Sequence, residues 1–220
     1  MIRDNYLDIS RITADPGVLK IFKIIRGYGG VVRFVGGAVR DALAGLKAAN
    51  IDLSTDLSPD ELAEACEEAG IRTAPIGLKI DTLGVAVGGT LLEISSLKKQ
   101  VKGGNGRTEV EFTDNWEEDA SRRDLTINAM AMDDSGRIVD PYGGMEDLRN
   151  HVLRHVSEAF SEDPVRILRV ARFSAKLCDF RIAEETMALM TLMVENGEAD
   201  ALVPERIWAE VSRGFASRHP

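Results

Sequence analysis

Residues 34–41 of the chain read Phe34-Val35-Gly36-Gly37-Ala38-Val39-Arg40-Asp41. The apolar run 31–35 predicts a buried strand, and residues 38–44 predict a short helix that ends at Gly45. The paired glycines therefore lie at a strand-to-helix turn. Glycines at such a turn let the backbone come close to a phosphate, and the amides at the start of a helix attract anions. A plain tight turn would use the same glycines, so the pair alone leaves both interpretations open.

Asn50, Ile51 and Asp52 follow at short range and begin a second predicted strand. Residues 50 and 52 of a strand point to the same side of the sheet. Two acidic side chains placed in this way hold paired divalent metal ions, which activate a 3′-hydroxyl and stabilise a leaving pyrophosphate. Asparagine offers a neutral carbonyl oxygen instead, so it binds a metal ion weakly and removes one negative charge. The pattern predicts a metal site at Asp52 and Asn50 that lacks part of its charge.

The segments that follow continue a mixed α/β pattern. A capping box that begins at Ser58 starts a helix, which ends at Gly70. The pair Gly88-Gly89 separates two β-rich runs and predicts a tight hairpin. Residues 98–106 carry three glycines and several cations with little apolar content, which predicts a loop.

Helical periodicity dominates the sequence after the turn Pro141-Tyr142-Gly143-Gly144. We therefore predict two domains, a mixed α/β domain over residues 1–145 and a helical domain over residues 146–220. The helices predicted in this second part of the chain cover residues 145–150, 164–177, 183–194 and 204–215.

The composition is that of an ordinary folded protein, with 44% hydrophobic and 29% charged residues. No apolar run approaches the ~20 residues that a membrane span needs, so we expect no membrane partner. The first residues lack the apolar core of a signal peptide, and Cys66 and Cys178 lack metal-ligand spacing; both features favour a cytoplasmic protein. The net charge of −9 argues against a nucleic-acid partner, but the distribution of basic residues matters more than their total. The oligomeric state is left open.

The glycine turn and the acidic strand together resemble motif A of the bacterial-type tRNA nucleotidyltransferases and poly(A) polymerases, which belong to the DNA polymerase β superfamily. That motif reads Gly-Gly-x-Val-Arg-Asp, a spacer, and Asp-x-Asp. The segment 122–172 is most similar to the enzymes that build the CCA end of tRNA. The resemblance implies an α/β nucleotidyltransferase head, with a mixed β-sheet and flanking helices, followed by an all-helical neck. The later motifs match at Arg122-Arg123-Asp124-Leu125-Thr126-Ile127-Asn128-Ala129, at residues 140–148 and 162–173, and at Pro204-Glu205-Arg206-Ile207-Trp208-Ala209-Glu210.

The resemblance assigns catalysis to Asp52 and Asn50, with Glu93 as a third carboxylate, and implies that Asp163 and Arg166 select the base. Asp163 and Arg166 lie three residues apart, which predicts that they share one face of a helix. Their side chains supply an acceptor and a fixed donor that can imitate the edge of a base, so that C or A is chosen without a template. Arg123 offers a planar cationic fork for phosphate oxygens, and Asn128 can bond a sugar hydroxyl. The nucleotide-binding residues are Gly36, Gly37, Arg40, Asp41, Arg123, Asp124, Asn128, Asp163, Arg166, Arg169 and Arg172.

Several of these residues also have an ordinary structural interpretation. Arg123 can be a surface arginine paired with Asp124, and Glu93 can be a charge on the open face of a strand. Arg169 and Arg172, which continue the face of Arg166, can form a plain basic stripe on a helix. The residues alone do not decide between these alternatives.

The resemblance implies an enzyme that transfers CMP and AMP from CTP and ATP to the tRNA 3′ end, with Mg²⁺ as cofactor. A poly(A) polymerase shares nearly every motif and remains an alternative, as do enzymes that add only part of the CCA end. A catalytically inactive protein that binds nucleotide or RNA is an alternative from a different class.

The sequence departs from the family pattern in two ways. Asn50 stands where the first aspartate of Asp-x-Asp belongs. Three explanations compete: a deliberate inactivation, a natural inactive relative and a rearranged site. The second departure is length, because family members carry further helical domains after the neck. A truncated chain and a compact form both fit this observation.

Overall fold

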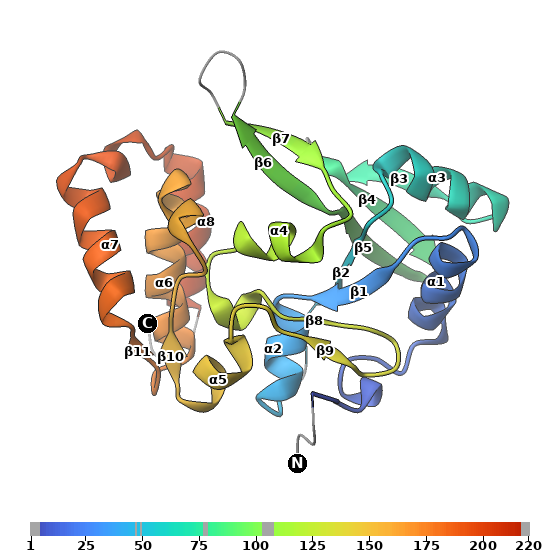
Figure 1. Cartoon of the computed structure of the whole chain (residues 1–220), viewed down its shortest axis with the longest axis horizontal. Coiled ribbons are helices and arrows are strands. Elements are labelled where there is room, and N and C mark those ends of the chain that lie inside the picture. The colour runs from blue at the N-terminus through green and yellow to red at the C-terminus, as the bar shows by residue number, and fades with distance from the viewer. Residues whose placement is uncertain (1–4, 47, 49, 77–78, 103–107, 217–220) are drawn as a thin grey trace. The chain divides into compact units, whose positions relative to one another are not determined.

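The computed structural model describes residues 5–46, 48, 50–76, 79–102 and 108–216 (Figure 1). The chain divides into two compact units. The first unit comprises Met1–Ala120 and Met130–Pro141, and the second comprises Ser121–Ala129 and Tyr142–Pro220.

A mixed sheet forms the centre of the first unit. Within the described residues its seven strands follow the order β3-β4-β5-β2-β1-β8-β9. The strands β2 and β5 run parallel to each other, whereas the other neighbours are antiparallel. The sheet confirms the predicted fold class, including the hairpin at Gly88-Gly89, which joins β4 to β5. The strands are β1 (Val32–Val35), β2 (Asp52–Thr55), β3 (Thr73–Ile76), β4 (Lys79–Val87), β5 (Thr90–Ser96), β8 (Ala131–Met132) and β9 (Ile138–Val139).

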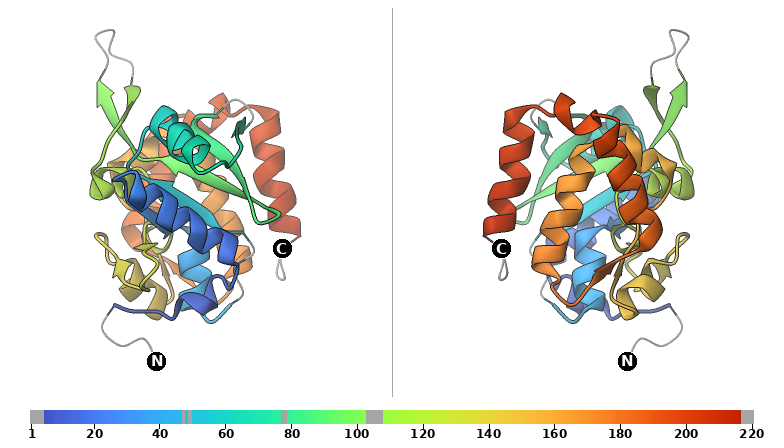
Figure 2. Two further views of the ribbon diagram at one scale, coloured as in Figure 1. Left: turned by 90° about the vertical axis from the view of Figure 1, so that its right-hand side faces the viewer. Right: turned by 90° about the vertical axis from the view of Figure 1, so that its left-hand side faces the viewer.

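One face of this sheet is apolar and covered by helices. Phe34, Leu53 and Ile94 lie in register on neighbouring strands, and each is at most 1% exposed. The ring of Phe22, from α1 (Pro16–Gly27), packs on Phe34 with 4.8 Å between ring centroids. Figures 1 and 2 show α1 beside α3 (Pro59–Glu68) on this side of the sheet. Since strand residues alternate between faces, the opposite face carries the residues between these apolar ones.

The opposite face of the sheet is polar. Arg33 and Ser54 are directly paired on β1 and β2. The guanidinium of Arg33 lies 4.2 Å from the ring centroid of Trp116, the first residue of α4 (Trp116–Ser121). Burial lowers the pKa of Arg33 from its usual value, and the charges of Asp133 and Asp56 oppose this effect. The polar face is therefore partly covered by α4 through an aromatic–cation contact.

The prediction of a loop over residues 98–106 is wrong for its first half. The strands β6 (Lys98–Lys102) and β7 (Thr108–Phe112) pair antiparallel, with Lys98 opposite Phe112. The rest of the predicted loop lies outside the described residues. The alternation of polar and apolar residues in Thr-Glu-Val-Glu-Phe, residues 108–112, is typical of a strand and outweighs the cations of its partner.

The second unit is mainly helical, as predicted, but includes a short parallel pair of strands, β10 (Val152–Leu153) and β11 (Arg181–Ile182). In the described part of the chain, no helix is both long and apolar enough to cross a membrane. The helices of this unit agree with the predicted ranges to within two residues and are α5 (Gly144–Arg149), α6 (Val165–Lys176), α7 (Glu184–Glu195) and α8 (Pro204–Phe215). Short 3-10 helices lie at η2 (Thr126–Asn128), η3 (Glu158–Glu162) and η4 (Glu198–Ala201).

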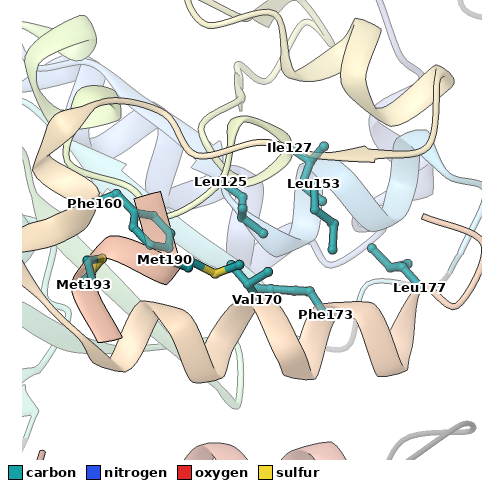
Figure 3. Close-up of a cluster of buried hydrophobic side chains, with 9 residues drawn as sticks. All are labelled: Leu125, Ile127, Leu153, Phe160, Val170, Phe173, Leu177, Met190 and Met193. Atoms are coloured by element: carbon teal, nitrogen blue, oxygen red, sulfur yellow. The ribbon is translucent and has the colours of Figure 1, made fainter. Parts of the chain in front are cut away.

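The core of the second unit explains why it includes Ser121–Ala129. Leu125 and Ile127, each 0% exposed, belong to the same buried cluster as Val170 and Phe173 of α6. Figure 3 shows Leu125 pointing toward α6 together with Leu153. The sequence predicted a single boundary after residue 145, whereas the chain leaves the first unit at residue 121, returns at 130 and leaves again at 142.

We expect Leu125→Ala to lower the free energy of unfolding by about 3 kcal/mol, because the truncation leaves a cavity in a closed core. Leu192→Ala is a matched control in the same unit, since Leu192 is 53% exposed and should change stability by less than about 0.5 kcal/mol. Urea denaturation followed by far-ultraviolet circular dichroism measures both. Equal effects of the two substitutions would contradict the placement of Leu125 in the core.

Candidate functional site

The predicted glycine turn is present at the end of β1. Gly36 is the N-cap of α2 (Gly37–Leu43) and has φ 64° and ψ −127°, a backbone conformation that residues with a side chain rarely adopt. A Cβ atom at Gly37 would lie 3.4 Å from Nη2 of Arg40. Gly36 thus allows the sharp reversal from strand to helix, whereas a Cβ atom at Gly37 would make only an ordinary contact with the guanidinium of Arg40.

Arg40 and Asp41, both predicted to bind nucleotide, form a buried ion pair. They are 4% and 5% exposed, and Nε and Nη2 of Arg40 donate to Oδ1 of Asp41 at 2.8 and 2.7 Å. A buried charge is tolerated only when an opposite charge neutralises it, as in this pair. The pair therefore has a structural role inside α2, the helix that follows Gly36. Contact of these residues with a nucleotide stays a prediction.

Asp52 and Glu93 come together on the polar face of the sheet. They are paired in the parallel register of β2 and β5, and strands in a sheet are about 4.8 Å apart. Both side chains are exposed, whereas the next residues, Leu53 and Ile94, are buried on the other face. Two residues from separate strands therefore place their carboxylates on the same side of the sheet, as the sequence predicted for Asp52 and as it left open for Glu93.

Asn50 lies outside the strand that was predicted to carry it. The ladder with β5 begins at Asp52, and Asn50 lies in an exposed bend before it. The expectation that residues 50 and 52 share one strand face is therefore wrong, because strand alternation does not extend to residue 50. Among the described residues, no group of three or more histidine, cysteine, aspartate or glutamate side chains could hold a metal ion.

The donor atoms on this face nevertheless suit Mg²⁺ in kind. Magnesium ions are commonly held by one or two carboxylates, with water and substrate phosphates completing the octahedron. Asp52 and Glu93 supply two carboxylates on this face, and the bend before β2 carries a neutral amide oxygen at Asn50. If the site held the pair of divalent ions that the sequence predicted, both ions would have to share these two carboxylates.

Asp124 is the centre of a polar cluster in the second unit. Its carboxylate is 5% exposed. Oδ1 accepts hydrogen bonds from the backbone amide of Leu125 at 2.8 Å and from the side chain of Asn128 at 3.0 Å. Oδ2 accepts from Nε and Nη2 of Arg169, each at 2.7 Å. Nη1 of Arg123, the neighbouring residue, lies 3.5 Å from the carbonyl oxygen of Asn128.

The charges of this cluster stabilise one another. Burial by itself would raise the pKa of Asp124, but the charge of Arg169 and the hydrogen bonds from Asn128, Arg169 and Leu125 lower it below its usual value. Burial likewise opposes the charge on Arg169, but Asp124 raises the pKa of that guanidinium. Both groups therefore stay ionised at neutral pH, and Asn128 is held by a charged acceptor.

Asp163 and Arg166, predicted to select the base, lie at the start of α6. Asp163 precedes the helix in an extended conformation, whereas Arg166 is in its first turn. Arg166 donates through Nη1 to the carbonyl of Ala159 at 2.7 Å and through Nη2 to the carbonyl of Arg122 at 2.5 Å. Burial lowers the pKa of Arg166, against the opposing charges of Asp124 and Asp163. Because Asp163 lies before the first turn of α6, the prediction that it shares a helix face with Arg166 is wrong.

A buried carboxylate that the sequence did not single out pairs with the remaining arginines. Glu210 of α8 is 6% exposed and accepts a hydrogen bond from Nε of Arg172 at 2.6 Å. Its Oε1 lies 4.0 Å from Nη1 of Arg169. The prediction that these arginines meet phosphates stays untested. The basic stripe on α6 was an indirect signal for Glu210, because a stripe buried against another helix needs acids there.

The mixed sheet, its glycine turn and its paired carboxylates define a nucleotidyltransferase head followed by a helical unit. Two solved structures are similar to this chain in fold. The Bacillus stearothermophilus CCA-adding enzyme in complex with CTP has a TM-score of 0.80 and 32% identity, covering 92% of this chain and 49% of that one. The Thermotoga maritima CCA-adding enzyme complexed with tRNA has a TM-score of 0.78 and 29% identity, covering 99% of this chain and 52% of that one.

Residues 32–154 match the poly(A) polymerase head domain, and the chain belongs to that family. The multifunctional CCA proteins of Azoarcus sp. and Chromobacterium violaceum are 47% and 49% identical to it over 192 residues, which are 84% and 86% of this chain. The chain spans 44% and 46% of the length of these two relatives. The family resemblance and the predicted fold are confirmed.

The Asp124 cluster predicts a pH dependence of stability. Because the native pKa of Asp124 is lowered, its ionised form contributes stability above the unfolded pKa of about 3.9, and this contribution is lost as the pH falls through the native pKa. We expect Asp124→Asn to cost about 3 kcal/mol at pH 6, because Arg169 loses its buried partner.

The same substitution should flatten the decline of stability below pH 4, as measured by urea denaturation at pH 6, 4 and 3. Asp114→Asn, which removes an exposed aspartate, is the control and should retain the steep decline. An equally steep decline in Asp124→Asn would show that other carboxylates dominate the acid response.

Proposed function

We propose that this chain is the nucleotide-transferring part of a CCA-adding tRNA nucleotidyltransferase. In this proposal CMP and AMP pass from CTP and ATP to the 3′ end of tRNA without a template. The observation that carries it is the pairing of Asp52 with Glu93 on the polar face of the sheet, next in strand order to the β1 turn at Gly36. Because the chain spans less than half of its curated relatives, the activity of the whole protein is part of the proposal. A cytoplasmic location remains a prediction from the sequence.

The first unit would carry the chemical step. Asp52 and Glu93 would hold Mg²⁺, with Asn50 as a neutral donor from the bend before β2. The metal would supply charge stabilisation at the transferred phosphate and lower the pKa of the attacking 3′-hydroxyl. The turn at Gly36 and Gly37 would let the backbone of the first unit approach the triphosphate, with the Arg40–Asp41 pair fixing that turn from within.

The second unit would choose the nucleotide. Cytosine and adenine both present an amino group beside a ring nitrogen acceptor, whereas uracil and guanine present a carbonyl oxygen at the equivalent position. An ionised carboxylate only accepts and a guanidinium only donates, so Asp163 and Arg166 match the first pattern and oppose the second. Arg123, Asn128 and the arginines of α6 would bind sugar and phosphates in the same step.

Asn50 supports a second candidate, a protein that binds nucleotide without turning it over. The amide removes one negative charge from the group that would hold metal, so positive charge is neutralised less well at the site. Such a change would lower turnover far more than nucleotide binding, because in this proposal the base and sugar contacts come from residues of the second unit. The same nucleotide-binding residues would serve both candidates.

We expect Asn50→Asp to raise incorporation of labelled CMP and AMP into tRNA that lacks its 3′ end by at least roughly 100-fold. The assay uses purified chain, Mg²⁺, CTP and ATP, and Asn50→Ala is the control that supplies no oxygen donor. No incorporation by the parent chain or by Asn50→Asp would refute the transferase proposal. Long tails of AMP alone would show a poly(A) polymerase instead.

Glu93 has an equally sharp test in the Asn50→Asp background. If Glu93 binds the metal, Glu93→Gln should lower turnover by about 100-fold or more with little change in CTP affinity. Glu111→Gln removes an exposed glutamate from β7 of the same unit and is the matched control. Equal turnover in the two variants would mean that Glu93 is an ordinary charge on an open strand face.

A further inference from the structure

The helix α8 presents charges that complement those of α6. Arg206 donates through Nη2 to Oδ2 of Asp163 at 2.7 Å. One turn further along α8, Glu210 accepts from Arg172 and lies near Arg169. The two helices pack on each other. Arg206 of α8 therefore faces Asp163, which precedes α6, and Glu210 of α8 faces two arginines within α6.

Both oxygens of the Asp163 carboxylate have a defined partner as a result. Oδ1 accepts from the backbone amide of Val165 at 3.3 Å, which is a long and weak hydrogen bond. Oδ2 accepts from Arg206 at a distance typical of a charge-assisted hydrogen bond. Arg166, the other base-selecting residue, is oriented by two backbone carbonyls. The orientation of Asp163 therefore depends mainly on one side chain from another helix.

We propose that Arg206 is a positioning residue that sets base selectivity by fixing the carboxylate of Asp163. This inference rests on the proposed role of Asp163 in selecting C and A. A fixed carboxylate accepts from the amino group of cytosine or adenine and repels the carbonyl oxygen of uracil or guanine. A carboxylate that rotates can turn away from that carbonyl oxygen, so the wrong base is rejected less strongly.

The exposure of the pair separates this role from a purely structural one. The side chains of Arg206 and Asp163 are 52% and 31% exposed, and ion pairs this exposed contribute little to stability. Glu210, by contrast, is buried and would weaken the fold when removed. Removal of the Arg206 guanidinium should therefore change selectivity in a chain that remains folded.

The experiment measures the affinity of the 220-residue chain for CTP, ATP, UTP and GTP, each with Mg²⁺, by competition with a fluorescent CTP analogue. The variants are Arg206→Ala, Arg206→Lys, Asp163→Ala and the double variant Arg206→Ala with Asp163→Ala. Arg26→Ala is the matched control, because Arg26 is an exposed arginine of the first unit that pairs with Asp134 at 2.6 Å. Thermal unfolding of every variant accompanies the binding data.

We expect Arg206→Ala to lower the preference for CTP over UTP, and for ATP over GTP, by about fivefold. Arg206→Lys should recover part of this preference, and Arg26→Ala should leave it unchanged. In the Asp163→Ala background the loss of Arg206 should have no further effect, because its action passes through that carboxylate.

Three results would overturn the inference in distinguishable ways. Unchanged selectivity in Arg206→Ala, with a selective parent chain, would remove the role of Arg206 and leave the proposed function standing. A parent chain that binds all four nucleotides equally would remove the role of Asp163 and with it that of Arg206. A further loss of selectivity when Arg206 is removed in the absence of Asp163 would show that the arginine acts on the nucleotide by another route.

Discussion

The buried carboxylate of Asp124 is the group on which the second unit depends. A carboxylate that is 5% exposed is tolerated only because Arg169 neutralises it and because Asn128 and a backbone amide fill its remaining acceptor positions. This requirement ties the 3-10 turn η2 to α6, and Arg169 in turn lies near Glu210 of α8. Three segments that are far apart in sequence are thereby held in one arrangement by charge, around the apolar cluster shown in Figure 3.

The sequence predicted the elements well and the relations among side chains poorly. The glycine pair, the hairpin at Gly88-Gly89 and the helices after residue 144 follow from local propensity and periodicity, which a sequence displays directly. Asn50 was placed on a strand because the alternation was extended past Asp52, where the ladder between β2 and β5 begins. Only the pairing with β5 defines that point. Glu210 was not singled out because a carboxylate in an amphipathic helix looks exposed until its neighbouring helix is known.

The two faces of the sheet explain how the first unit separates stability from chemistry. Phe34, Leu53 and Ile94 lie on one side under α1, and their alternation leaves Asp52 and Glu93 on the other. A polar residue on this second face does not weaken the apolar core directly. The charge at position 52 or 93 can therefore vary without unfolding the sheet, whereas a register shift by one residue in β2 would bury Asp52 and expose Leu53.

The path of the chain between its two units has a consequence for how it can be divided. Ser121–Ala129 contributes Leu125 and Ile127 to the second core, and Met130–Pro141 then supplies β8 and β9 to the first sheet. Neither unit is a continuous piece of polypeptide, so a cut at any single peptide bond removes part of one core. To express the first unit alone, residues 121–129 would have to be excised and Ala120 joined to Met130.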